Sequence, residues 1–438
     1  MIVMKFGGSS VANAENIIKV INIIQEKKEA KVVVFSAMGG ITDALENVWQ
    51  SYQNKDVIDA QCCLIKQVFM NLISELFSDD SVKLICKALV NYSIENIIKL
   101  ERVNTLKRVN VVSLGEKLTS FIIHQYCQEL GMNTELIDAE KLIRKNSNNE
   151  VNQKFITENC SLLLSNRKPS SIYITQGFVC STVGGQTSVL GRGGSDYSAT
   201  LIGAAIKAKA IEIWSDTNGV LNNDPRKVTN TTTVNAISYD EATEMAFFGA
   251  KILHPKCLIP AKERSIKVIV KNTFNPEFSG TVISSKTTHT TVVKAAATKE
   301  NVSILNIKSN RTLTENEFIS KTFKTLSKYQ QQTDLMSITN VTIAIAIVAN
   351  SQIETCINKL SKFSSVSVLK EQSIITLVGN LSSNSSGNSD TILKSFKKIP
   401  IKMIGYGSSN TSISIVIDKA DQNRALQNVN EYIFNLKN

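Results

Sequence analysis

The sequence has no Cys-x-x-Cys pair, few histidines and no long apolar runs. Its 438 residues include eight cysteines, with no Cys-x-x-Cys pair, and three histidines, which argues against structural disulfides and zinc sites. Apolar runs such as Val341–Ala349 are too short to cross a bilayer, and no signal-peptide pattern precedes the first glycines. We therefore predict a cytoplasmic protein of roughly two or three domains with no membrane partner.

Two common nucleotide-binding motifs are also missing. The sequence has no Gly-x-x-x-x-Gly-Lys-Ser/Thr loop and no Gly-x-Gly-x-x-Gly after a strand, so it favours neither a P-loop NTPase nor a Rossmann dehydrogenase. The formal net charge is +11, but the basic residues are scattered and form no recognisable nucleic-acid-binding module. We predict that the chain has no nucleic-acid partner.

Short β-branched segments alternate with helical patterns in the N-terminal part of the chain. Strands are expected at Lys31–Phe35, Val109–Ser113, Ile172–Thr175 and Ala210–Trp214. Helical patterns include Glu116–Leu130, Ser195–Ala208, a long helical excursion over 55–107, and a helix opened by the capping box at Ser238–Glu241. This alternation predicts an α/β domain with a mostly parallel central sheet covered by helices on both faces.

A second region follows a stretch rich in Ser, Thr and Gly around Phe274–Lys294, which predicts a linker. We place the α/β domain at 1–285 and the second region at 295–438. Within the second region, two strand–helix–strand units with similar layouts indicate a tandem repeat of small α+β modules, at about 300–370 and 371–438. The polar segment Asn380–Asp390 is expected to be a loop.

Three glycine-rich loops carry the chemistry of the first domain. Met4–Ser10 places Lys5 before Gly7, Gly8 and Ser9, where a first strand turns into a helix. Glycines let the backbone approach a ligand closely, and Lys5 supplies a charge for phosphate. The other loops are Ser36–Asp43 and Gly191–Asp196. Because the carboxyl ends of parallel strands share one edge of the sheet, the loops predict a common anion-binding site.

Side chains in and near these loops suit an amino dicarboxylate. Thr42, Arg192 and Ser195 offer donors for carboxylates, and Arg192 can bind one with two hydrogen bonds. Glu116 offers a negative charge for an ammonium group, as does Asp196. Taken singly, each of these two acids is also a common first-turn residue that complements a helix dipole.

In this order and spacing, the three loops resemble the aspartokinase branch of the amino-acid kinase family, most of all its monofunctional, lysine-sensitive members. The similarity extends to Gly405–Asn410. It implies an αβα sandwich followed by two ferredoxin-like ACT modules, and a homodimer or tetramer held together by those modules. It also implies phosphorylation of the β-carboxylate of L-aspartate by ATP. This reaction gives 4-phospho-L-aspartate, at the start of lysine, threonine, methionine and diaminopimelate biosynthesis, under feedback by an amino acid.

The resemblance also assigns roles to individual residues. The catalytic residues would be Lys5 and Asp196. The residues that bind aspartate would be Ser36, Thr42, Glu116, Arg192 and Ser195. The residues at ATP would be Lys5, Gly7, Gly8, Ser9, Ser215, Asp216, Arg226 and Lys251. Mg²⁺ would arrive with ATP without direct protein ligation, near Asp216, and the effector L-lysine would bind at Asp334 and Thr339.

Two other functions compete with this interpretation. The first is a related amino-acid kinase for another acidic substrate, such as glutamate or carbamate. The second is an amino-acid sensor that has lost catalysis, which the departures at Leu221, where tyrosine is usual, and Asn340, where an acid is common, would suit. The presence of Lys5, Glu116 and Arg192 favours the enzyme.

Overall fold

The computed structural model describes residues 1–52, 54–102, 105–164, 171–250, 253–285, 292–381, 388–407 and 409–435. These residues form two compact units. The N-terminal unit contains the described residues of Met1–Val220 and Leu253–Thr287, and the C-terminal unit contains those of Leu221–Ile252 and Thr288–Asn438. Residues 221–250, which we assigned to the α/β domain, therefore pack with the C-terminal unit.

The strands of the N-terminal unit form a mostly parallel sheet in the order β3-β4-β2-β1-β7-β9-β10. Neighbouring strands are parallel from β3 to β9, and β10 is antiparallel to β9. The bounds of these strands are β1 (Ile2–Phe6), β2 (Lys31–Phe35), β3 (Thr134–Leu136), β4 (Ile172–Gln176), β7 (Ile211–Ser215), β9 (Val268–Asn272) and β10 (Thr281–Ser284). A separate hairpin consists of β5 (Val179–Ser181) and β6 (Thr187–Val189).

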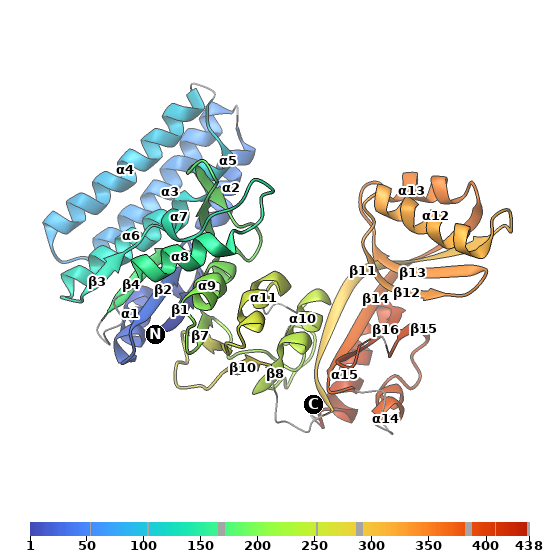
Figure 1. The fold of residues 1–438 in the computed structure, drawn as a ribbon. Coiled ribbons are helices and arrows are strands. Elements are labelled where there is room, and N and C mark those ends of the chain that lie inside the picture. Colours follow the sequence, from blue (N-terminus) through green and yellow to red (C-terminus); the bar gives the residue numbers. More distant parts are fainter. Residues whose placement is uncertain are drawn as a thin grey trace. The chain divides into compact units, whose positions relative to one another are not determined.

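Helices connect these strands and cover the sheet (Figure 1). Their bounds are α1 (Ala14–Glu26), α2 (Ile41–Gln50), α3 (Lys55–Leu76), α4 (Asp80–Arg102), α5 (Arg108–Val112), α6 (Leu114–Glu129), α7 (Ala139–Leu142), α8 (Gln153–Leu163), α9 (Gly194–Ala205) and α11 (Pro255–Glu263).

Successive side chains of β1 point to opposite faces of the sheet, so their contacts show which helices cover each face. Met4 and Phe6 belong to a core that also contains residues of α1, α2, α3 and α6. Val3 points to the opposite face, where Gly203 of α9 lies close to it. Lys5 has the parity of Val3, so its side chain is on the α9 face. The sheet therefore has helices on both faces, which confirms the predicted fold class.

Two expectations about local structure are wrong. Val109–Ser113, predicted as a strand, lies largely in α5, and the N–H of Ser113 donates to the carbonyl of Val109. Val111 and Val112 are buried where α5 packs against α2, and a short β-branched run there gives the same hydrophobic signal as a strand. The predicted linker contains β10. Most of the expected loop Asn380–Asp390 lies outside the described residues.

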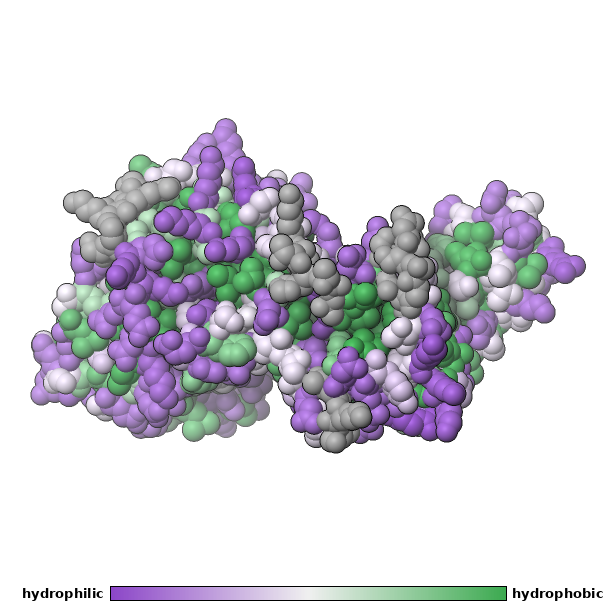
Figure 2. All heavy atoms as spheres, turned by 90° about the horizontal axis from the view of Figure 1, so that it is seen from below, coloured by the Kyte–Doolittle hydropathy of each residue, from purple (hydrophilic) through white to green (hydrophobic). Residues whose placement is uncertain are grey.

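One described helix, α3, is long and apolar enough to cross a membrane by length and composition alone. Its buried residues, which include Ile58, Cys62, Ile65 and Phe69, follow a spacing of three and four and join the core. The helix is therefore packed as an amphipathic core element. In Figure 2, hydrophilic residues cover much of the visible face of this unit, with apolar residues scattered among them.

The C-terminal unit is built around a six-stranded sheet in the order β12-β13-β11-β14-β16-β15. Its neighbouring strands are antiparallel. The bounds are β11 (Val293–Ser309), α12 (Glu315–Lys328), β12 (Thr333–Ile338), β13 (Thr342–Val348), α13 (Ile353–Leu360), β14 (Ser364–Gly379), α14 (Asn388–Ser395), β15 (Ile401–Gly405), β16 (Ser412–Asp418) and α15 (Gln422–Tyr432). The unit also contains β8 (Ala236–Ser238) and α10 (Tyr239–Phe247).

The order of elements repeats, as the sequence predicts for two modules. Each half runs strand, helix, strand, strand, helix, and the long first strands β11 and β14 pair at the centre of the sheet. Figure 1 shows α12 beside α13 in one half and α14 beside α15 in the other. Each half has its own core, one around Phe318 and Leu360 and the other around Phe396 and Leu426. This agrees with a pair of ACT-like modules sharing one sheet.

Candidate functional site

A cavity of about 590 Å³ gathers the catalytic and substrate-binding residues that the sequence predicts. It lies within the N-terminal unit, where the loops after β1 and β2 meet the first turns of α2, α6 and α9. The predicted residues that line it are Lys5, Gly8, Ser36, Thr42, Glu116, Arg192, Ser195 and Asp196. Residues separated by up to 191 positions in the chain thus share one cavity (196 minus 5).

Lys5 and Asp196 form an ion pair in this cavity. The Nζ of Lys5 lies 2.6 Å from Oδ1 of Asp196, and the two side chains are 11% and 18% exposed. Lys5 comes from β1 and Asp196 from the first turn of α9, the helix on the same face of the sheet. The carboxylate therefore fixes the position of the ammonium group, which remains accessible to an anion in the cavity.

The first two glycine loops touch through their backbones. The N–H of Gly39 donates to the carbonyl of Gly8 at 3.0 Å. A Cβ atom at Gly8 would lie 2.9 Å from the carbonyl oxygen of Ala37, which is closer than side-chain atoms tolerate. Glycine is therefore required at position 8 because the two loops approach each other, and this approach places Lys5 near the start of α2.

Glu116 lies in the first turn of α6 and is almost completely buried, with 3% exposure. Burial raises the pKa of its carboxyl group to about 7, although backbone N–H donors, including that of Ala37, and the charge of Lys5 oppose the shift. Its Oε2 is buried and has no hydrogen-bond partner among the described residues. An unpartnered carboxylate oxygen at a cavity wall suits a ligand that brings a cation.

The third loop depends on an unusual backbone. Gly193 adopts φ +69°, and a Cβ atom there would lie 2.8 Å from Cβ of His254. His254 caps α11 by accepting a hydrogen bond from the N–H of Lys256, which supports a structural role for it. Phe178, which also lines the cavity, has φ +65° although it is not a glycine. Such strain is concentrated where the surrounding structure holds a ligand site.

The predicted nucleotide residues are less closely grouped. The N–H of Gly7 donates to the carbonyl of Trp214, which joins the first loop to the end of β7. Ser9 begins a short 3₁₀ turn after that loop. Ser215 ends β7, next to β1 in the sheet, and the exposed Asp216 follows it. These residues therefore lie at the same sheet edge as Lys5.

The fit of Mg²⁺ to this edge depends on one carboxylate, that of Asp216. No cluster of three or more His, Cys, Asp or Glu side chains suitable for a metal occurs in the part of the chain that the structure describes. Mg²⁺ commonly binds through one or two carboxylates together with substrate phosphates and water. Asp216 thus fits a metal that is delivered by a nucleotide.

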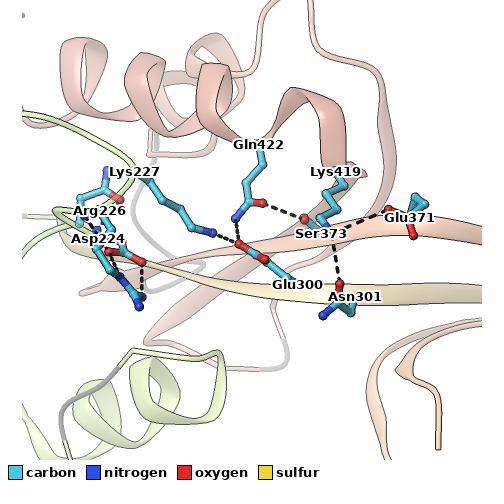
Figure 3. A network of polar contacts seen from close by, with 10 residues as sticks. Asp224, Arg226, Lys227, Glu300, Asn301, Glu371, Ser373, Lys419 and Gln422 are labelled. Carbon is cyan, nitrogen blue, oxygen red and sulfur yellow. Dashed lines mark hydrogen bonds and ion pairs between the residues drawn. The ribbon is translucent and has the colours of Figure 1, made fainter.

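Arg226 belongs to the C-terminal unit, where Asp224 binds it. Its Nε and Nη2 donate to the two carboxylate oxygens of Asp224 at 2.9 and 2.7 Å, as Figure 3 shows. The hydrogen bonds from Arg226 lower the pKa of the Asp224 carboxyl group. The role of Arg226 at the phosphates stays a prediction, and Lys251 lies outside the described residues.

Figure 3 also shows a polar network on the same unit, in which Glu300 pairs with Lys227 and accepts a hydrogen bond from Gln422. Lys419 donates to Asn301 at 3.2 Å. These contacts connect the segment before β8 with β11 and α15. They hold Lys227 to Glu300 of β11, which Gln422 of α15 also contacts.

The cavity has lining residues that the sequence did not single out. Asp43 and Glu46 follow Thr42 on α2, and Arg108 begins α5. Glu46 lies one helical turn beyond Thr42, so extending the second loop into its helix would have included it. No motif marks Arg108, because it reaches the cavity only through the packing of α5 against α2.

The predicted effector residues lie on and after β12. The Oδ1 of Asp334 is 2.6 Å from Nζ of Lys299, and the Asp334 side chain is only 1% exposed. Burial raises the pKa of Asp334 against the opposing effect of Lys299. Its Oδ2 is buried without a hydrogen-bond partner among the described residues. The exposed Thr339 forms the turn to β13, where its Oγ1 accepts from the N–H of Thr342.

Comparison with known proteins places this geometry in a family. Residues 1–272 match the amino acid kinase family, and residues 375–432 match an ACT domain. Aspartokinase 1, chloroplastic, of Arabidopsis thaliana is 30% identical over 459 residues, covering 99% of this chain and 80% of the relative. The chain belongs to the aspartokinases.

Two proteins of Escherichia coli extend the family comparison. Lysine-sensitive aspartokinase 3 is 28% identical, covering 99% of each chain. The structure of E. coli aspartokinase III in complex with aspartate and ADP superposes with a TM-score of 0.86 at 27% identity, covering 99% of this chain and 100% of that one. The aspartokinase resemblance inferred from the glycine loops is therefore confirmed, together with the fold.

Proposed function

We propose that this chain is an aspartate kinase, which transfers the γ-phosphoryl group of ATP to the β-carboxylate of L-aspartate. The observation that supports this most directly is the cavity shared by Lys5, Glu116 and Arg192. It offers an ammonium for the transferred phosphoryl group, a buried carboxylate for the substrate ammonium, and a guanidinium for a carboxylate. This is the set of charges that an amino dicarboxylate and a phosphate require.

The chemistry needs little beyond positioning and charge. An oxygen of the β-carboxylate attacks the γ-phosphorus, the bond from phosphorus to the bridging oxygen breaks, and ADP leaves. The carboxylate is already ionised at neutral pH, so no strong base is required. Lys5, held by Asp196, neutralises the charge that builds on the phosphoryl oxygens, while Thr42, Ser195 and Arg192 orient the substrate. Near Asp216, Mg²⁺ delivered with ATP would supply further positive charge.

Gly7 and Gly8 let the backbone approach the reacting groups closely, and Ser9 and Ser36 offer hydroxyl donors to them. Ser215 and Asp216 border the nucleotide. We further propose that Arg226 and Lys251 face its phosphates. The reaction would take place in the cytoplasm. The ACT modules would join chains into a homodimer or a tetramer.

The test is release of ADP by the purified full-length chain with ATP, Mg²⁺ and L-aspartate. We expect turnover that depends on aspartate and is absent with carbamate, and that is at least tenfold slower with L-glutamate, since the cavity positions one carboxylate at a fixed distance from the ammonium. ATP binding without turnover of any acidic substrate would instead favour the amino-acid sensor. Turnover of glutamate in preference to aspartate would assign the chain to the related kinase.

We also propose that L-lysine inhibits the chain by binding at Asp334 and Thr339. Lys299 already places an ammonium on Asp334, so a free amino acid must compete with a group of this chain. The Nζ of Lys299 also lies 4.8 Å from the centroid of the Phe247 ring, which helps to hold it there.

Replacing Lys299 by methionine should therefore increase lysine sensitivity. We expect the lysine concentration that halves ADP release to fall by about tenfold, because the carboxylate of Asp334 loses its resident cation. Lys394→Met, which removes an exposed pair with Asp390, is the matched control and should change nothing. An unchanged or higher half-inhibiting concentration in Lys299→Met would show that Lys299 does not compete with the effector.

A further inference from the structure

Arg108 brings a second guanidinium to the substrate cavity. It begins α5 and lines the same cavity as Arg192 and Glu116. Its Nε donates to Oε2 of Glu46 at 3.0 Å, and its Nη2 pairs with Oε1 of the same carboxylate. Glu46 lines the cavity from α2. The pair therefore forms part of the cavity wall where α2 and α5 meet.

The arrangement fixes the guanidinium without using all its donors. A guanidinium has five N–H groups, and a carboxylate that binds Nε and Nη2 leaves those of Nη1 for another acceptor. The Arg108 side chain is 45% exposed and that of Glu46 is 27% exposed, so water or a ligand can reach them. Two hydrogen bonds to one planar acceptor also restrict the rotamers of Arg108, which lowers the entropy lost when it binds an anion.

The charges of the cavity indicate why Arg108 matters. Among its described lining residues, the cations are Lys5, Arg108 and Arg192, and the carboxylates are Asp43, Glu46, Glu116 and Asp196. Asp196 already pairs with Lys5. Without Arg108, the negative charges of Glu46 and Asp43 would face an anionic substrate with no cation beside them. Arg192 would then be the one lining cation that no described carboxylate binds. Carboxylates that line the same cavity as an anionic substrate repel it, and the repulsion is stronger where the site is partly shielded from water.

We propose that Arg108 is a second anion-binding residue of this cavity, which shares the carboxylates of the amino dicarboxylate with Arg192 and thereby sets the preference for a doubly acidic substrate. Glu46 is its positioning residue. This inference rests on the proposed function and deepens it, because it names a specificity-determining side chain of the same site. It assigns a role to a contact between residues 62 positions apart.

The test compares three variants of the full-length chain in the ADP-release assay. Arg108→Met should raise the KM for L-aspartate about tenfold or more, with kcat within about twofold and the KM for ATP unchanged, because a charge-assisted contact to the substrate is lost. Glu46→Gln should lower the KM for aspartate about two- to threefold, because the amide oxygen can still accept a hydrogen bond from Arg108 while the negative charge that competes with the substrate is removed. The double variant should lie between Arg108→Met and the original chain.

A purely structural role predicts a different pattern. If the pair only joined α2 to α5, Arg108→Met and Glu46→Gln would both raise the KM, would lower the Tm alike, and the double variant would equal either one. That pattern would overturn the inference. Arg102→Met is the matched control, because Arg102 pairs with Asp59 on the α3–α4 hairpin and does not line the cavity. It should leave both KM values unchanged.

Calorimetric titration measures whether the original chain binds L-aspartate at all. Together with the ADP-release assay, it separates failure of this inference from failure of the proposed function. Normal turnover by the original chain, with an Arg108→Met KM within twofold of it, would overturn the role of Arg108 and leave the kinase intact. A chain that neither binds aspartate nor releases ADP with it would overturn both.

Discussion

Replacing Lys5 by methionine should reduce aspartate-dependent ADP release about a thousandfold or more. Removing one preorganised donor to a developing charge commonly costs 10²–10³ in kcat, and here the removed donor carries a full charge. The change also leaves the Asp196 carboxylate, 2.6 Å from Nζ in the original chain, beside an incoming phosphate that it would repel. The measurement is kcat at saturating ATP and aspartate.

Two further variants show that the loss is chemical and not a folding defect. Lys19→Met removes an exposed lysine that is also 2.7 Å from a carboxylate, that of Glu15, and should keep full activity. The double variant Lys5→Met/Asp196→Asn removes the stranded charge and should recover any lost Tm without recovering turnover. Near-normal kcat in Lys5→Met would contradict the assigned catalytic role.

The second large effect is expected at Glu116 and depends on pH. Its carboxyl group has a pKa raised to about 7 by burial, and only the ionised form can bind the substrate ammonium. The apparent KM for aspartate should therefore be level above about pH 8 and rise about tenfold for each pH unit below about pH 6.5. Initial rates over this range, with ATP saturating, measure the shift.

Glu116→Gln should raise the KM for aspartate about a hundredfold at pH 8 and abolish its pH dependence between about pH 6 and 8, since an amide neither titrates nor pairs strongly with an ammonium. Glu135→Gln, at an exposed position of β3, is the matched control and should retain the profile. A pH dependence that survives in Glu116→Gln would assign the titration to another group.

Glu116→Gln should keep or gain thermal stability at pH 8, although it loses affinity for aspartate. A carboxyl group with a raised folded-state pKa stabilises the fold fully below its ordinary pKa, and this contribution is lost as the pH rises through about 7. At pH 8 the original chain must bury the charged form, whereas the glutamine is neutral. We therefore expect Glu116→Gln to have an equal or higher Tm at pH 8, which a merely structural residue would not show.

Much of the fold follows from local pattern. The β-branched runs of β2, β4 and β7 are short and bounded by turn residues, and the structure has strands there. The capping box at Ser238 opens α10 as expected. The start of α5 shows where such reasoning fails. A five-residue valine-rich segment is compatible with a buried strand or a buried helix, and only its packing against α2 distinguishes them.

The candidate site was predictable where its residues sit in loops that need glycine. Gly8 and Gly193 mark close backbone approaches, and the charged residues beside them, Lys5 and Arg192, line one cavity. Arg108 had no such marker. Its position depends on side-chain packing between two helices that are distant in sequence. An exposed arginine outside any motif gives no indication in the sequence that it lines the cavity.

The chemistry of the site can be predicted from local sequence: the glycine loops, the lysine and the carboxylates that an acidic substrate and a phosphate require. These features are local, because backbone freedom and side-chain charge belong to single residues and their neighbours. Which charged side chains form pairs depends on the packing of the folded chain. That packing pairs Lys5 with Asp196, Lys299 with Asp334 and Arg108 with Glu46, because ion pairing depends on distances of a few ångströms that packing alone sets.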